Sequence, residues 1–96
     1  MKNTVEHPDI DEILDTQIKD LLDNNKSIIL FNDTVNNFDY VIDCLIVYCN
    51  HSSIQAEQCA LIAHNQGLCN VKSGSIKELT KIYNALKEKK LSVEIQ

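Results

Sequence analysis

A short apolar run at residues 27–31, Ser-Ile-Ile-Leu-Phe, limits the folds open to this chain more than any other stretch. Its β-branched and aromatic residues are typical of a strand buried on both faces in the middle of a sheet. The polar residues Asn32-Asp33-Thr34 follow at once and predict an exposed rim that a strand and a helix hold in place. An Asn-Asp pair alone is more often an ordinary turn. With the rest of the chain, we expect this rim to bind a small cationic group.

The residues after the rim predict two helices. Asn36 is the expected N-cap of a helix over about 37–50. A capping box of Ser52 and Gln55 predicts the start of a second helix, which ends at Gln66 with Gly67 as its C-cap. The first helix presents one apolar face: Phe38, Val41, Ile42, Leu45, Tyr48 and Cys49. The second presents a stripe of small residues with His64 at its edge: Ala56, Cys59, Ala60 and Ala63.

The last third of the chain predicts two strands with a helix between them. Leu68–Lys72 is a short strand, and Ser73-Gly74 is expected to form a turn. A capping box of Ser75 and Glu78 starts a third helix that runs to about residue 89. Its inward residues are Ile76, Leu79, Tyr83 and Leu86. Leu91, Val93 and Ile95 alternate with polar residues, as in a half-buried strand.

The element order is therefore β-α-α-β-α-β. It predicts an α/β sandwich of the α+β type, in which three short antiparallel strands pack with three helices on one face. This architecture is similar to that of the ribosomal stalk C-terminal domain. We expect one domain over residues 26–96.

Residues 1–25 differ from the rest in charge. They carry two lysines and seven acids, whereas residues 26–96 carry seven of each. A helix over about 10–22 is possible because apolar residues recur there at helical spacing. Either this helix packs on the domain, or the segment is a mobile acidic arm. We expect a flexible extension.

Composition excludes several classes of protein. The chain contains no arginine and its net charge is −5, so a nucleic-acid partner is disfavoured, although residues 72–90 carry six lysines and two acids. No apolar run approaches the roughly 20 residues that cross a bilayer, and no secretory signal is visible. We expect a cytoplasmic protein with no membrane or nucleic-acid partner.

The four cysteines show no spacing typical of a zinc site, so we expect buried free thiols and no metal. A metal site of His51, His64 and cysteines is disfavoured for the same reason. A small enzyme would need a reactive group. The best candidates are His64, Cys59 and Cys69, and their spacing in the sequence matches no known arrangement of nucleophile and base. We expect no catalysis and no cofactor.

Several motifs together resemble the ClpS family, the adaptors that deliver N-degron substrates to AAA+ Clp unfoldases. They are Ile29-Leu30-Phe31-Asn32-Asp33, Phe38-Asp39-Tyr40-Val41-Ile42-Asp43, His64-Asn65-Gln66-Gly67, Cys69 and Leu91-Ser92-Val93-Glu94-Ile95. The resemblance covers about residues 26–96.

The resemblance implies an adaptor that binds the free α-amino group of substrates whose first residue is Leu, Phe, Tyr or Trp. It implies docking to the N-terminal domain of a Clp AAA+ unfoldase. Asn32, Asp33 and His64 would bind the α-amino group, since an ammonium donates hydrogen bonds and these side chains accept them. The implied pocket for the first side chain is formed by Asn36, Phe38, Val41, Ala60, Ala63 and Leu91.

The chain departs from the family at several positions, among them Asn36 and Asn37 at the helix start and a shorter segment between Gly67 and Cys69, and three departures bear on the ligand. Thr34 stands where a second aspartate is common, Phe38 where a methionine usually gates the pocket, and Ala60 where a larger residue is common. Phe38 and Ala60 are therefore expected to shift the ranking of first residues. The alternative to the adaptor function is an interaction module of the same fold with a different partner, which would be indifferent to a free amino terminus.

Overall fold

The computed structural model describes residues 14–15, 18 and 24–96. The predicted helix over about 10–22 lies outside the described residues except for Leu14, Asp15 and Ile18, which are helical. The remaining elements follow the predicted order: β2 (Lys26–Phe31), α2 (Phe38–Cys49), α3 (Ser53–Gln66), β3 (Leu68–Gly74), α4 (Ile76–Glu88) and β4 (Val93–Ile95).

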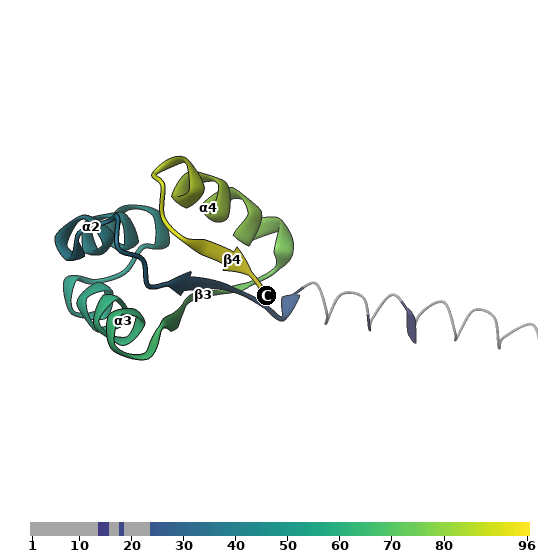
Figure 1. The fold of residues 1–96 in the computed structure, drawn as a ribbon. Coiled ribbons are helices and arrows are strands. Elements are labelled where there is room, and N and C mark those ends of the chain that lie inside the picture. Colours follow the sequence, from purple (N-terminus) through teal and green to yellow (C-terminus); the bar gives the residue numbers. More distant parts are fainter. Residues whose placement is uncertain (1–13, 16–17, 19–23) are drawn as a thin grey trace, which may run out of the picture.

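The three strands form one antiparallel sheet in the order β3-β2-β4, with β2 in the centre as predicted. Ile28, Ile29 and Leu30 are all buried, so β2 is covered on both faces. Cys69 of β3 and Val93 of β4 lie opposite Leu30, on the face that packs against the helices. In Figure 1, α2 and α3 lie side by side and α4 lies over β4.

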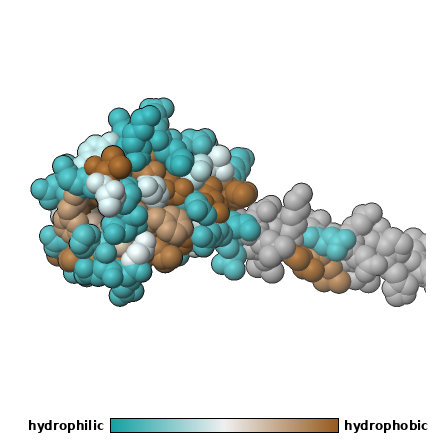
Figure 2. Space-filling model, viewed as in Figure 1, coloured by the Kyte–Doolittle hydropathy of each residue, from teal (hydrophilic) through white to brown (hydrophobic). Residues whose placement is uncertain are grey.

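The core between this face and the helices is built from aliphatic residues and free thiols. Leu45, Leu79 and Leu86 are fully buried in it. All four cysteines are free; Cys59 is half-buried and the others are buried. Hydrophilic residues cover much of the surface shown in Figure 2, with apolar residues between them. Within the described residues, no helix is long and apolar enough to cross a membrane.

The predicted capping box of α4 and the predicted C-cap of α3 are confirmed. At the start of α3 only the Ser52 half of the predicted capping box forms among the described residues, and the predicted cap of α2 is wrong by one residue. Ser52 accepts a hydrogen bond from the Gln55 backbone, and Gly67 ends α3 with φ 98°. The Asn37 side chain, rather than that of Asn36, accepts a hydrogen bond from the Tyr40 backbone at 2.8 Å. The Asn36 side-chain nitrogen instead donates to the Asp33 carboxylate and to the Lys90 carbonyl, and these two bonds hold the side chain away from the start of the helix.

Two further predictions are wrong. Ser73 and Gly74 do not form a turn but end β3, because β2 begins at Lys26 and pairs with both of them. Ile76 does not face the core, because it is the first residue of α4 and its side chain is 43% exposed. The buried residues of α4 are Leu79 and Leu86.

Candidate functional site

The end of β2 is fixed from both sides. The Phe31 backbone N–H donates to the Ser92 carbonyl at 2.8 Å, and the Asn32 backbone N–H donates to the Gly67 carbonyl at 3.0 Å. Gly67 can close α3 beside the strand because its positive φ is accessible to glycine. The backbone of Asn32 is thereby held while its side chain remains exposed.

The Asp33 carboxylate organises the loop that follows. Its Oδ1 accepts from the backbone N–H groups of Val35 at 3.0 Å and Asn36 at 2.8 Å. Its Oδ2 accepts from the Asn36 side-chain amide at 3.0 Å and from the Ser92 hydroxyl at 2.8 Å. A carboxylate has about four lone-pair sites, so these bonds use most of its capacity. Asp33 therefore shapes the loop and carries its negative charge.

The same hydrogen bonds keep Asp33 ionised. Partial burial raises the pKa of its carboxyl, but the bonds from Asn36, Ser92 and Val35 together outweigh burial, so the pKa lies below its ordinary value of 3.8. The donors favour the charged form because an ionised oxygen accepts more strongly than a protonated one.

Two bonds tie this loop to the segment between α4 and β4. The Asn36 side-chain amide also donates to the Lys90 carbonyl at 2.9 Å. The Tyr40 hydroxyl, on the first turn of α2, donates to the Lys89 carbonyl at 2.8 Å. The loop is thus held by residues more than 45 positions away in the chain.

A pocket of about 320 Å³ lies between this loop and helices α2 and α3. Ala60 and Ala63 are almost fully buried and form a wall of small side chains on α3. Phe38, 38% exposed, and half-buried Val41 contribute from α2. The complete lining is Leu30, Phe31, Asn32, Asp33, Asn36, Phe38, Val41, Ala60, Ala63 and His64.

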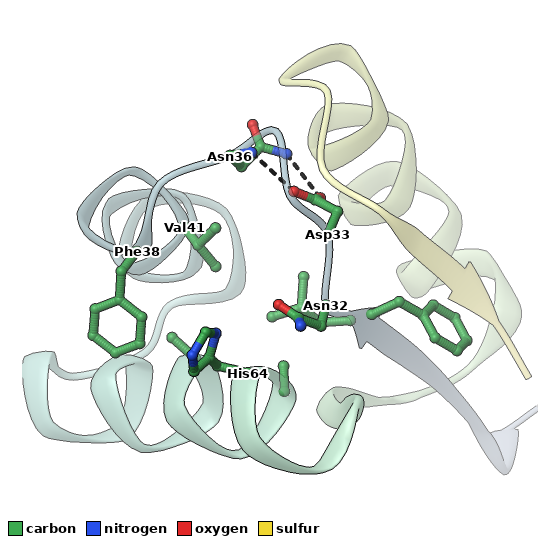
Figure 3. A pocket seen from close by; sticks show the side chains of 10 residues that line it. Asn32, Asp33, Asn36, Phe38, Val41 and His64 are labelled. Atoms are coloured by element: carbon green, nitrogen blue, oxygen red, sulfur yellow. Dashed lines mark hydrogen bonds between the residues drawn. The ribbon is translucent and has the colours of Figure 1, made fainter.

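The pocket has a polar side and an apolar side. Figure 3 shows the side chains of Asn32 and His64 facing each other across it, with Phe38 and Val41 on the α2 side. The carboxylate of Asp33 turns away from His64 toward Asn36. The amide and the imidazole offer hydrogen-bonding atoms beside apolar walls, an arrangement suited to a ligand with one polar and one apolar end.

The structure brings together eight of the nine residues that the sequence singled out for this site. The exception is Leu91, which is buried in the core and does not line the pocket. Leu91 lies just before β4, outside the strand that was predicted to include it, and its side chain packs in the core, whereas the next residue, Ser92, reaches Asp33. Sequence reasoning missed the part played by Ser92 because the two residues are 59 positions apart and no local pattern joins them.

Apart from His64, the residues considered for other chemistry do not line this pocket. His51 is 6% exposed, and its Nε2 bonds to the Val71 carbonyl at 2.7 Å. Burial, and then the hydrogen bond with Cys69, raises the pKa of Cys59 to about 12. Burial raises the pKa of Cys49 to about 11. Thiols with such values stay protonated and are poor nucleophiles at neutral pH. Among the described residues, no group of three or more potential ligands could hold a metal ion.

Comparisons with known proteins agree with this architecture. The structure is similar to that of Agrobacterium tumefaciens ClpS2 bound to L-phenylalaninamide, with a TM-score of 0.71 and 16% sequence identity over 77% of this chain and 96% of that one. At this identity the likeness concerns the fold. No curated protein matches the sequence. The family model for the ATP-dependent Clp protease adaptor protein ClpS matches residues 23–94. Its members are adaptors rather than enzymes, and this chain belongs to the ClpS family.

Proposed function

We propose that this ClpS-family adaptor binds the free α-amino group and the bulky hydrophobic first side chain of N-degron substrates. Leu, Phe, Tyr and Trp are the first residues expected to bind. The observation that carries the proposal is that Asn32 and His64 face each other in one pocket, beside the apolar wall of α2 and α3. The solved relative was bound to L-phenylalaninamide, which has both a free amine and an aromatic side chain.

The amine would bind on the polar side. An α-ammonium has three donors; the Asn32 carbonyl oxygen and a neutral imidazole nitrogen of His64 can each accept one. Hydrogen bonds to a charged group contribute about 1.5–3 kcal/mol each. Asp33 adds a negative charge at the rim and holds the loop, while most of its acceptor capacity is already used within the chain. Asn32 and His64 are therefore the direct partners, and Asp33 acts mainly through charge and position.

The first side chain would occupy the apolar part of the pocket. Burying an aromatic side chain of about 150–250 Å² stabilises the complex by roughly 4–6 kcal/mol before the cost of association. Acetylation of the amine would remove its charge and leave acceptors without donors, a strong ground for discrimination. A serine in the first position would leave the apolar wall uncovered.

Fluorescence anisotropy tests the proposal with three labelled peptides that differ only at the amino end. The peptide beginning with free Phe should bind, whereas its N-acetylated twin and a twin beginning with Ser should bind at least tenfold more weakly, given the energies above. Asn32→Ala and His64→Ala should each weaken binding of the Phe peptide. Asn65→Ala is the matched control, because Asn65 is exposed on α3 beside His64 but does not line the pocket. Equal or absent binding of all three peptides would refute the proposal and favour an interaction module with another partner.

Delivery would require a second contact, with the N-terminal domain of a Clp AAA+ unfoldase. Family membership supports this partner. Calorimetric titration of the isolated unfoldase domain into the full chain should show binding both with and without the Phe peptide. The domain would contact a different surface, so the pocket would remain free for substrate. Failure of several such domains to bind would contradict the delivery step while leaving peptide recognition intact.

A further inference from the structure

A second hollow, of about 430 Å³, begins where the pocket ends. The two share Phe31 and Asn32, the last residue of β2 and the residue that follows it. The remaining lining comes from α4, from β4 and from the residue just before β4: Tyr83, Lys87, Ser92, Val93 and Glu94. Figure 3 shows β4 and α4 on the side of Asn32 away from His64. A ligand held at Asn32 therefore has the pocket on one side and this hollow on the other.

The floor between the two spaces is rigid. The backbone N–H of Phe31 is bonded to Ser92, and that of Asn32 is bonded to Gly67. The Ser92 hydroxyl is bonded to Asp33, so β4 is also tied to the loop at the rim of the pocket. A chain passing over Asn32 would meet a surface that is already formed, which lowers the entropic cost of binding.

Three polar side chains of the hollow have no partner among the residues that the structure describes. The hydroxyl of Tyr83, the ammonium of Lys87 and the carboxylate of Glu94 form no hydrogen bond or ion pair with them, although all three line the same space. Two of these groups donate and one accepts. A peptide unit has one N–H and one C=O, so an extended backbone would match this set.

We propose that the hollow binds the backbone of the second and third residues of the peptide whose first residue occupies the pocket. The inference rests on the proposed function, because Asn32 holds the amino end that sets the direction of the chain. Lys87 and Glu94 contribute one charge of each sign, so neither charge is favoured on the side chains at these two positions. The recognised group is the peptide backbone, and the subsite accepts many sequences.

A length series tests the subsite with peptides that carry no side chain beyond the first residue. The probes are L-phenylalaninamide and the amides of Phe-Gly-Gly and Phe-Gly-Gly-Gly-Gly, measured by calorimetry on the full chain. The three-residue amide is expected to bind about tenfold more tightly than phenylalaninamide, as two further neutral hydrogen bonds would provide. The five-residue amide should show no additional gain.

Variants assign this gain to the hollow. Tyr83→Phe, which keeps the ring, and Lys87→Ala, at an exposed position, should each reduce the gain with length. Lys81→Ala is the matched control, because Lys81 is exposed on α4 outside the hollow and its removal should preserve the gain. Length-independent affinity, or an equal gain in all variants, would overturn the subsite alone. Absence of binding for all three amides would overturn the proposed function and this inference with it.

Discussion

Ser92→Ala removes one of the four hydrogen bonds that the Asp33 carboxylate accepts. The bond from the Ser92 hydroxyl is 2.8 Å long and joins the loop after β2 to the residue just before β4. A hydrogen bond to a charged group contributes about 1.5–3 kcal/mol. Asp33 is only partly buried, so water can replace the lost donor in part, and we expect a loss of about 1 kcal/mol in the free energy of unfolding.

The loss should depend on pH. The pKa of Asp33 lies below its ordinary value of 3.8 in the folded protein, so its bonds stabilise the fold at any pH above that value. This stabilisation disappears as pH falls through the lowered folded pKa, because the protonated carboxyl no longer accepts as strongly. Ser92→Ala brings the folded pKa closer to the unfolded one, so the variant and the parent should differ most at neutral pH and least near pH 2.

Urea unfolding at pH 7 and near pH 2 measures both effects. Ser73→Ala is the control, because within the described part of the chain the Ser73 hydroxyl bonds only to the uncharged side chains of Ser27 and Asn70, and its removal should show no such dependence on pH. A loss in Ser92→Ala that is as large near pH 2 as at pH 7 would refute the argument that the bond acts through the ionised carboxylate.

Three further predictions concern the pocket, the core and the thiols. Ala60→Leu should narrow the pocket and weaken binding of a Trp-first peptide by about tenfold, with less effect on a Leu-first peptide, since overpacking costs about 1–3 kcal/mol. Fluorescence anisotropy measures both affinities, with Gln58→Leu on the exposed face of α3 as the control. If Ala60→Leu and Gln58→Leu weakened peptide binding equally, Ala60 would not limit the size of the pocket. Leu86→Ala should lower the free energy of unfolding by about 2–5 kcal/mol in urea titrations, because Leu86 is fully buried, and a loss below about 1 kcal/mol would contradict its place in the core. At pH 7, Cys49 and Cys59 should react with iodoacetamide far more slowly in the folded protein than in the protein unfolded in urea, because burial raises their pKa values to about 11 and 12. Labelling is measured by mass spectrometry, and a folded-state rate equal to the unfolded-state rate for either cysteine would disprove this.

Local patterns were sufficient for the order and type of the elements. The buried central strand follows from the unbroken apolar run at 27–31, and the starts of α3 and α4 follow from Ser52 and Ser75, whose caps involve residues only three positions away. Gly67 ends α3 for an equally local reason, its positive φ. The family motifs, also local, brought eight lining residues of the pocket into one prediction.

Tertiary packing decided how the loop after β2 is held. Asn36 is a good helix cap by composition, yet its amide bonds to Asp33 and Lys90, and the cap falls to Asn37. Leu91 turns into the core, while Ser92 meets Asp33 across 59 positions.

The sequence by itself therefore determined which elements form and which polar residues end the central strand, since helix caps and periodic burial depend on neighbours within a few residues. Only the tertiary structure decided that the Asp33 carboxylate is occupied within the chain, that Asn32 and His64 face the pocket, and that a second hollow adjoins it. These features depend on distances between side chains that the packing of α3, α4 and β4 against β2 sets, and no pattern along the chain encodes those distances.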